Sequence, residues 1–381
     1  MTDAKTGEVR VRTHYKSRIR TPQGQRTKNG FKTLTAARAY EAKELEKIRT
    51  SSWTDPSAAR TKVQNVFEDW IEAKQISNRT RFDYREVWTA CIAPTWANIP
   101  LKDVSPSGIN RWISDLTNRY SPARVKKAGT VYNQVLNWAV ADQLIPTNPM
   151  QRAQQLSKGS FYPKPGVKAE IFFLSKDQVR ALANAIEQHS LMILVLAFTG
   201  VRFGEITALQ VKDIDLLGKR INVQRAWSDV GGHLEEAPPK SGKARSIPLT
   251  QELTGLLGKH LATLERPTSL VFTGQKGGPL THGVWNRRFL GPAKKRLGLT
   301  DLTTHGLRHT YAVLSIQAGV NAKVLQQAMG HSNIHMTLDT YGGFFESDLD
   351  ALGERLGEAT REDLSVSDGS FLVPVARIGS P

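Results

Sequence analysis

Four separated segments in the C-terminal half of the chain carry polar residues that could do chemistry. The segments are AFTGVRFGEITAL, PPKSGKARSIPL, THGLRHTYAVL and MGHSNIHMTLDTYGGF. A guanidinium beside a strongly apolar helix is costly unless it meets an anion, and Arg202 follows LMILVLAFTG in this way. Each segment alone has an ordinary structural explanation, so the ordered set carries the indication. In chain order the set is Arg202 and Glu205; Lys240 and Lys243; His305, Arg308 and His309; and His331, His335 and Tyr341.

Two histidine pairs at helical spacing first suggest a zinc site. His305 and His309 are four residues apart, and so are His331 and His335. However, no carboxylate lies between the histidines, as it does in the His-Glu-x-x-His pattern. Arg308 would also place a cation beside the metal. We therefore expect no metal and no cofactor.

Two arginines, a lysine, histidines and a tyrosine instead suit phosphoryl transfer without a metal. Two guanidiniums can clamp the non-bridging oxygens of a phosphodiester, which gain charge in the transition state. The phenol of Tyr341 can attack phosphorus if its proton is removed, because its free pKa is about 10. A lysine can protonate the departing oxygen. The product, a phosphotyrosyl ester, stores the bond energy, so resealing needs no ATP.

The charge of the whole chain agrees with a polyanionic partner. Of 381 residues, 52 are Lys or Arg and 35 are Asp or Glu, which gives a formal net charge of +17. No apolar run approaches the roughly 18 residues of a membrane span, and the first residues lack a signal-peptide core. Cys91 is the single cysteine, which excludes internal disulfides and fits a cytosolic protein. Nucleic acid is therefore preferred over a membrane surface.

Residues 1–60 are predicted to form a small basic DNA-binding domain. The alternating pattern of VRTHYKSRIRTPQGQRTKNGFKTL, broken at Pro22-Gln23-Gly24, predicts a β-hairpin. A helix should follow it, with Thr35 as its N-cap. A basic hairpin can lie in a major groove, although a solvated charged hairpin is the alternative. The predicted DNA contacts here are Arg10, Arg12, Lys16, Arg18, Arg20, Arg26 and Lys28.

Residues 61–158 are predicted to be entirely helical. Apolar stripes at helical spacing run through Val63–Ile71 and Ile109–Leu116, and Ser105-Pro106 and Ser121-Pro122 are start signals. The last helix should stop before Ile145-Pro146. Four tryptophans, Trp70, Trp88, Trp112 and Trp138, are predicted to be core residues. Arg124, Lys126 and Lys127 give the fourth helix a basic, DNA-binding surface.

Residues 159–170, rich in Lys, Gly and Pro, predict a linker, and a new domain should begin at 171. Ser175 is expected to cap its first helix. The segments RINVQRAW, HLEEAPPK and RSIPLT predict three short strands, and several helices complete the domain to 350. The tail 351–381 has no clear pattern. The predicted fold is therefore multidomain and mainly α with small β-sheets.

These motifs resemble the tyrosine recombinases, specifically the phage-type integrases. The resemblance rests on TGVRFGE, PKSGKARSIPL, HGLRH, MGHS and TLDTYGGF, and it covers nearly the whole chain. It implies an N-terminal ββ(β)α arm-binding domain, a helical core-binding domain and a mixed α/β catalytic domain. The tail would pack on a neighbouring protomer, with Leu349, Leu352 and Leu356 on one amphipathic face.

The resemblance also implies a role for each residue of the set. Arg202 and Arg308 would hold the scissile phosphate, while His305 and His331 hydrogen-bond it. His305 would assist proton transfer from Tyr341, which forms the 3′-phosphotyrosyl link. Lys240, chosen over Lys243 for its spacing before Arg245, would protonate the leaving 5′ oxygen. Glu205 would support Arg202, whereas His309 and His335 would serve packing or local hydrogen bonds.

The resemblance predicts a site-specific DNA recombinase that integrates and excises a phage genome. It would work as a homotetramer on double-stranded core and arm attachment sites, through a Holliday junction, in the bacterial cytoplasm at the nucleoid. A host factor that bends DNA and a factor that directs excision are further expected partners. The alternatives are an integrase of a conjugative transposon or other mobile element, a chromosome-dimer resolvase, a type IB topoisomerase, and a non-catalytic DNA-binding regulator.

Overall fold

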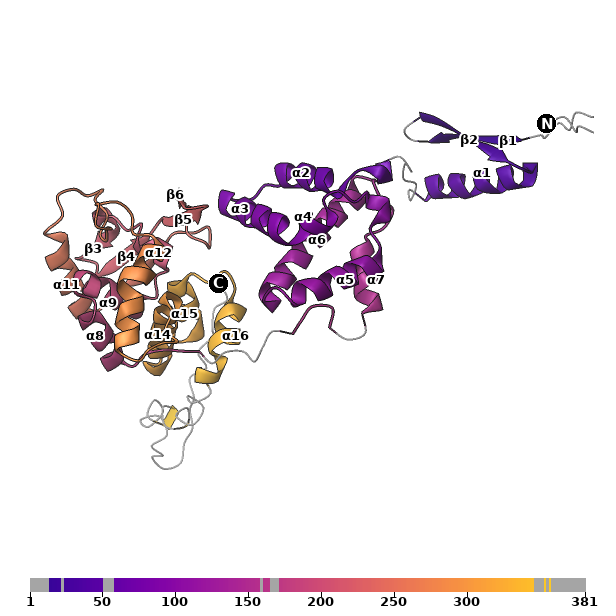
Figure 1. The fold of residues 1–381 in the computed structure, drawn as a ribbon. Coiled ribbons are helices and arrows are strands. Elements are labelled where there is room, and N and C mark those ends of the chain that lie inside the picture. The colour runs from indigo at the N-terminus through magenta and orange to yellow at the C-terminus, as the bar shows by residue number, and fades with distance from the viewer. Residues whose placement is uncertain are drawn as a thin grey trace, which may run out of the picture. The chain divides into compact units, whose positions relative to one another are not determined.

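The computed structural model describes residues 14–21, 24–50, 58–157, 160–164 and 171–345, with 353, 356 and 357. The chain divides into two compact units, Met1–Ala169 and Glu170–Pro381 (Figure 1). Within the described residues the elements are mostly helices, with three small sheets, which confirms the prediction of a mainly α fold with small β-sheets. Most of the predicted linker and of the predicted tail lies outside the described residues, and so do Leu349, Leu352, Arg10 and Arg12.

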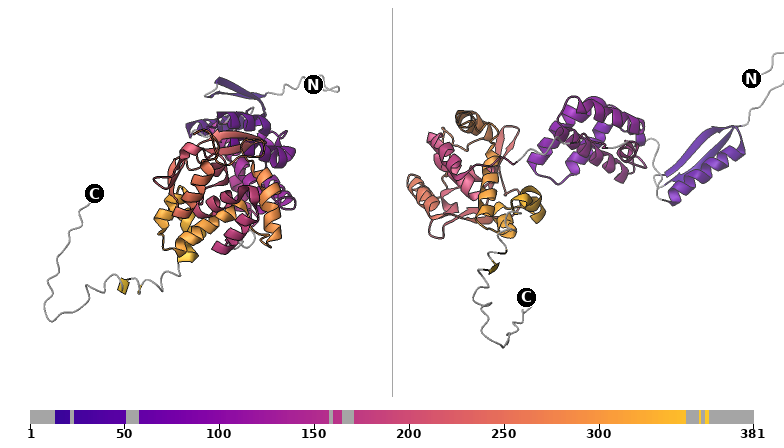
Figure 2. Two further views of the ribbon diagram at one scale, coloured as in Figure 1. Left: turned by 90° about the vertical axis from the view of Figure 1, so that its left-hand side faces the viewer. Right: turned by 90° about the horizontal axis from the view of Figure 1, so that it is seen from below.

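An antiparallel hairpin and one helix open the first unit. The strands β1 (Tyr15–Thr21) and β2 (Gly24–Phe31) pair, and α1 (Leu34–Arg49) runs alongside them, as the right-hand view of Figure 2 shows. The helix is capped by Thr33, whose side chain accepts a hydrogen bond from the Ala36 amide. The predicted cap, Thr35, is wrong, because the chain already turns into the helix at Leu34.

The two strands carry their basic residues on opposite faces. Lys16, Arg18 and Arg20 alternate with the buried residues of β1 and are exposed. Lys28 pairs across the hairpin with buried Ser17, and its ammonium lies 4.3 Å from the ring centroid of Tyr40 on α1. Arg26, opposite buried Ile19, shares the helix-facing side of the sheet. Of the described basic residues of the two strands, therefore, only those of β1 lie on the face away from α1.

Residues 58–157 form a helical bundle around a tryptophan-rich core. The predicted stripes are buried, including Phe67, Trp70, Ile109 and Trp112. Phe67 stacks on Trp88 with ring centroids 3.9 Å apart. The helices are α2 (Val63–Ala73), α3 (Asn78–Val87), α4 (Ala93–Trp96), α5 (Pro106–Thr117), α6 (Pro122–Ala141) and α7 (Pro149–Leu156), with short helical turns at Ala58–Arg60, Trp88–Ile92 and Leu101–Asp103.

The prediction that the last helix ends before Ile145-Pro146 is wrong. After α6 ends at Ala141, a further helix, α7, begins at Pro149, and Asn148 caps it by accepting from the Met150 amide at 2.8 Å. Met150 and Ala153 bury its inner face. Pro146 and Pro149 mark a bend between two helices rather than the end of the helical region.

Trp138, predicted to be a core residue, is only half-buried.

The second unit is built around an apolar helix, α9 (Ser190–Thr199). As predicted, Ser175 opens α8 (Lys176–Asn184), and it does so with a full capping box. α9 packs between α8 and α14 (Thr304–Gln317). The remaining helices are α10 (Phe203–Ile206), α11 (Gln251–Leu261), α12 (His282–Trp285), α13 (Gly291–Arg296), α15 (Ala322–Met329) and α16 (Ile334–Phe345), with shorter helical turns at Glu187–His189, Val211–Asp213 and Asn286–Leu290.

Two small antiparallel sheets lie in this unit, and they correct the prediction of three strands. One sheet has the order β3 (Ile214–Asp215), β4 (Arg220–Val223), β7 (Arg245–Pro248), and the other pairs β5 (Ala226–Val230) with β6 (His233–Ala237). The segment RINVQRAW is thus divided between β4 and β5. Arg225 lies at the break, where its guanidinium pairs with the buried carboxylate of Asp213.

Among the described residues, no single helix is long and apolar enough to cross a membrane, although α8 and Glu187–Thr199 together, bent by 117°, meet the length and composition of a broken span.

Candidate active site

The six residues to which the resemblance gives a catalytic role all line one cavity of about 430 Å³ in the second unit: Arg202, Lys240, His305, Arg308, His331 and Tyr341. They come from four separate places in the chain: the end of α9, the β6–β7 loop, the first turns of α14, and the segment from the end of α15 through α16. The lining residues are Arg202, Lys240, Ser241, His305, Arg308, His309, Gly330, His331, Ser332, Met336, Asp339, Thr340 and Tyr341.

The first arginine is placed by a tight turn after α9. Gly200 ends that helix with φ +62, and a Cβ there would lie 2.3 Å from the Tyr311 ring. Arg202 follows as the N-cap of α10, and its backbone amide donates to the Glu205 carboxylate at 2.9 Å. Its guanidinium donates to the same carboxylate at 2.9 Å and remains 20% exposed. The turn therefore directs Arg202 into the cavity.

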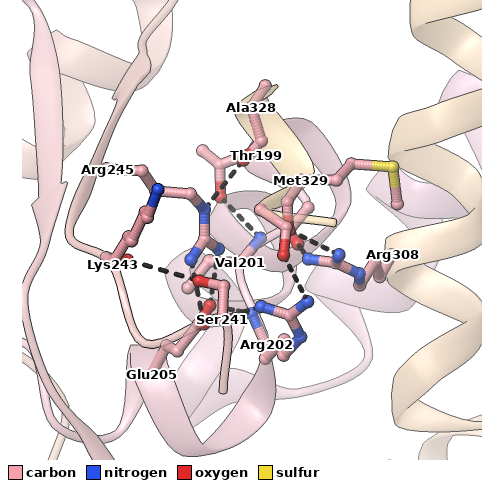
Figure 3. Close-up of polar contacts among 12 residues, drawn as sticks. Thr199, Val201, Arg202, Glu205, Ser241, Lys243, Arg245, Arg308, Ala328 and Met329 are labelled. Atoms are coloured by element: carbon pink, nitrogen blue, oxygen red, sulfur yellow. Dashed lines mark hydrogen bonds and ion pairs between the residues drawn. The ribbon is translucent and has the colours of Figure 1, made fainter. Parts of the chain in front are cut away.

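Three arginines cap the C-terminal end of α15. Arg245 Nε donates to the Ala328 carbonyl at 2.9 Å, Arg308 to Met329 at 2.6 Å, and Arg202 to Gly330 at 3.0 Å. The last carbonyls of a helix lack partners within it and carry the negative end of its dipole. The two arginines of the predicted clamp, Arg202 and Arg308, are thus held side by side by two adjacent carbonyls, and Arg245 binds the carbonyl that precedes them (Figure 3).

Glu205 is the buried anion beneath this cluster. Its side chain is 1% exposed, and Arg245, 8% exposed, donates to both carboxylate oxygens at 2.9 and 2.6 Å. Burial raises the pKa of Glu205, but the hydrogen bond and charge of Arg245, and then Arg202, lower it by more. Figure 3 shows Arg202 and Arg245 on two sides of this carboxylate. Arg245 had no predicted role, although an arginine at the start of the predicted strand RSIPLT was a usable signal.

Arg308 is the most buried cation of the set. It is 2% exposed, and its other nitrogen donates to the Gly200 carbonyl at 2.5 Å. Burial, followed by the charge of Arg202, lowers the pKa of Arg308 to about 9. Arg308 therefore stays charged at neutral pH. Because this buried charge is only partly balanced by the Glu205 carboxylate, an anion bound in the cavity would be favoured.

Of the two candidate lysines, Lys240 reaches the cavity. It lies in the β6–β7 loop beside Ser241, and the loop turns at Gly242 with φ +71. Lys243 is exposed and is outside the cavity lining. Its carbonyl accepts from the Ser241 hydroxyl at 3.3 Å. The loop geometry thus favours the spacing argument that selected Lys240.

The two cavity histidines of the predicted set are held in their neutral forms. Desolvation, and then the charges of His309 and Arg308, lower the pKa of His305 to about 4. Desolvation and Arg308 lower the pKa of His331 to about 4 as well. His331 Nδ1 lies 2.9 Å from the buried Thr337 hydroxyl, which fixes its ring. Within the described chain, no group of three or more His, Cys, Asp and Glu side chains is placed to hold a metal ion.

Tyr341 lies on α16 with its side chain packed into the unit. It is 1% exposed, and burial raises the pKa of its phenol to about 12. The phenol oxygen lies 2.7 Å from Nδ1 of His309. The prediction of a packing or local hydrogen-bonding role for His309 missed this contact, because nothing in the sequence pairs positions 309 and 341.

His335, the other histidine predicted to serve packing or a local hydrogen bond, is exposed and therefore not a packing residue. Its backbone amide donates to the Asn333 side chain at 3.0 Å. In the first unit, Lys126 is exposed, and the ammonium of Lys127 lies 3.3 Å from the Asp83 carboxylate. Arg124 is half-buried, and its Nε has no hydrogen-bond partner among the described residues. The basic surface of α6 is therefore partly neutralised.

Known proteins resemble the chain at the level of both sequence and fold. Residues 173–343 match the phage integrase family model. A protein of Mycobacterium tuberculosis named as a prophage phiRv2 integrase is 28% identical over 312 residues, which cover 79% of this chain and 81% of that protein.

Two solved structures of DNA complexes share the fold. The integrase of transposon Tn1549, bound to transposon right-end DNA, aligns with a TM-score of 0.65 at 21% identity, over 77% of this chain and 100% of that one. A lambda integrase tetramer bound to a Holliday junction aligns with a TM-score of 0.55 at 18% identity, over 85% and 91% of the two chains.

Proposed function

The chain is a tyrosine recombinase of the phage integrase family, and from this premise we propose that it cuts and rejoins DNA through a 3′-phosphotyrosyl intermediate to integrate and excise a phage genome. The observation that carries the proposal is the single cavity that collects all six residues of the set from four distant segments. Two guanidiniums, a lysine, two histidines and a phenol match the needs of phosphoryl transfer without a metal.

In the proposed reaction Arg202 and Arg308 hold the scissile phosphate. Their guanidiniums lie next to each other because they bond adjacent carbonyls, Gly330 and Met329, at 3.0 and 2.6 Å. Both arginines line the cavity, so a phosphate bound there would accept charge-assisted hydrogen bonds from the two guanidiniums. His305 and His331, neutral near pH 7, can donate one hydrogen bond each to the phosphate oxygens.

Tyr341 is the proposed nucleophile and Lys240 the proposed acid. The phenol attacks phosphorus, the bond to the 5′ oxygen breaks, and Lys240 gives a proton to that oxygen. The phosphotyrosyl ester conserves the free energy of the broken bond. Attack by a free 5′ hydroxyl of another strand then reverses the step and completes the exchange.

Double-stranded DNA is the proposed partner of both units. On the first unit we propose that Lys16, Arg18 and Arg20 contact an arm-type site from the open face of the hairpin. Lys126 and Lys127 on α6 are proposed to contact the core site. Arg26, Lys28 and Arg124 are proposed to contribute less. Arg26 and Arg124 are half-buried, and the ammonium of Lys28, although exposed, lies over the Tyr40 ring on the α1 side of the hairpin.

We propose that the active assembly is a tetramer on a Holliday junction, in the cytoplasm of a bacterial host. The fold shared with the lambda integrase tetramer supports this assembly. A host factor that bends DNA and a factor that directs excision would act on it. The fold shared with the Tn1549 integrase favours a second candidate, integration of a conjugative transposon or another mobile element by the same chemistry.

A nicked suicide DNA substrate tests the proposal. The wild-type protein should form a covalent protein–DNA adduct that survives SDS, and it should do so in EDTA. The Tyr341→Phe variant lacks the attacking oxygen and should form none. An adduct in Tyr341→Phe would overturn the assignment of the nucleophile, and loss of the wild-type adduct in EDTA would require a metal.

A further inference from the structure

His309 lies against the phenol of Tyr341 inside the cavity. Its Nδ1 is 2.7 Å from the phenol oxygen, and the two rings meet edge to face with centroids 5.7 Å apart. His309 belongs to α14 and Tyr341 to α16, so the contact exists only in the folded chain. A group at this distance from a reacting proton is within reach to accept it.

The protonation states of the two side chains decide the direction of this hydrogen bond. Burial, and then the charge of Arg308, lower the pKa of His309 below its ordinary value of 6.5, so the imidazole is neutral at physiological pH. Burial raises the pKa of Tyr341 to about 12, so the phenol keeps its proton. The phenol therefore donates and Nδ1 accepts, and the ring proton is assigned to Nε2.

We propose that His309 removes the proton of Tyr341 as the phenol attacks the scissile phosphate. The inference rests on the proposed function, in which Tyr341 is the nucleophile. As the bond from the phenol oxygen to phosphorus forms and the bond to the 5′ oxygen breaks, the phenol proton moves to His309 Nδ1. Lys240 gives the proton that the 5′ oxygen needs. In strand joining, the imidazolium returns its proton to the departing phenolate.

The geometry assigns this proton to His309 rather than to His305. The two imidazoles touch edge to face, with centroids 4.8 Å apart, and both line the cavity. Among the described hydrogen bonds, however, the phenol oxygen is joined to His309. The His305 side chain is the more exposed of the two, so its imidazole is accessible to a phosphate in the cavity.

Bound DNA would make His309 a stronger base. Arg308, next to it in α14, lowers the pKa of His309, and a phosphate held by Arg308 offsets that positive charge. Proton transfer then becomes easier once the substrate is in place. The other charged or titratable groups that line the cavity are Arg202, Lys240, His305, His331 and Asp339.

Three variants of His309 test the proposal in single-turnover cleavage of the suicide substrate. His309→Ala removes the acceptor and should slow adduct formation by about 100-fold or more, the range for general acid–base catalysis. His309→Gln and His309→Asn can accept a hydrogen bond but take no proton, so they should be nearly as slow. His335→Ala, at an exposed position of α16, is the matched control and should cleave at the wild-type rate.

A substrate with sulfur in place of the bridging 5′ oxygen separates the two proton transfers. Its thiolate leaves without protonation, so this substrate should restore the rate of Lys240→Ala. The defect of His309→Ala should persist, because the phenol must still lose its proton. Restoration of His309→Ala by this substrate would instead place His309 on the leaving-group side and overturn the proposal.

The outcomes separate this inference from the proposed function. If wild type forms the adduct, Tyr341→Phe does not, and His309→Ala is within about threefold of wild type, then His309 is not the base and the recombinase reaction stands. A wild-type rate in His309→Gln would reduce His309 to holding the tyrosine and would also overturn the proposal. Circular dichroism and DNA binding of each variant exclude misfolding as the cause of a slow rate.

Discussion

Replacing Arg245 with methionine should destabilise the second unit strongly, although Arg245 lies outside the cavity lining. In the wild type, each oxygen of the Glu205 carboxylate accepts one hydrogen bond from Arg245, at 2.9 and 2.6 Å, and one from Arg202, both at 2.9 Å. Methionine fills the space of the arginine stem but leaves this buried carboxylate with half of its donors. It also leaves the Ala328 carbonyl without the donor at 2.9 Å.

The expected loss follows from the burial of the pair. Removing one partner of a buried ion pair costs about 3–5 kcal/mol, because the remaining charge is left uncompensated. Arg202 still neutralises part of the charge, so we expect a loss of about 3 kcal/mol, the lower end of that range. Arg202 would also turn further toward Glu205, so cleavage of the suicide substrate should fall as well.

Urea unfolding measures the effect, with hydrogen exchange of residues 171–345 reporting on this unit alone. Arg220→Met is the matched control, because Arg220 is an exposed arginine on the neighbouring strand β4 and should change stability by less than about 0.5 kcal/mol. If Arg245→Met costs less than about 1 kcal/mol, the Arg245–Glu205 pair does not support the fold and the reasoning is refuted.

Three further predictions concern the acid limit, the end of α15 and the hairpin. The pKa of Glu205 is lowered in the folded state, so the ionised carboxylate contributes its full stabilisation above its ordinary pKa of 4.5, and this stabilisation is lost as the pH falls through the folded pKa. Glu205→Gln should therefore be less stable than wild type at neutral pH, and its stability should fall less on acidification. Urea unfolding midpoints from about pH 6 to 3 measure this difference. Gly330→Ala should lower the free energy of unfolding by about 1–3 kcal/mol, measured by thermal unfolding, because φ at Gly330 is +63 and a Cβ there would lie 3.0 Å from the Arg245 side chain. The control Gly283→Ala, where a Cβ would meet open space, should be nearly neutral. Reversing the charges of Lys16, Arg18 and Arg20 should weaken binding to arm-site DNA and lower the salt dependence of the binding constant by as much as about 3 in log–log slope, while core-site cleavage survives. Reversing the charges of Arg26 and Lys28 should weaken arm-site binding less. An equal loss of core-site cleavage would contradict a separate arm site.

Local signals in the sequence were reliable where a few neighbouring residues decide the structure. Ser175 and Ser105 cap their helices as predicted, and the apolar stripes of α2 and α5 are buried. The errors arose where two local solutions compete. Thr33 and Thr35 can each cap a helix, and Ile145-Pro146 can end a helical region or bend it before α7.

The sequence by itself determined the chemistry of the site. The order of the six polar residues, their immediate contexts and the net positive charge indicated phosphoryl transfer on DNA, because residue type and spacing set which reactions are possible. Only the tertiary structure decided which groups touch. His309 meets Tyr341, and Arg245 shares Glu205 with Arg202, because α14, α16, β7 and α10 are brought together by long-range packing. Such contacts join residues 32 and 40 positions apart, and no periodicity along the chain encodes them.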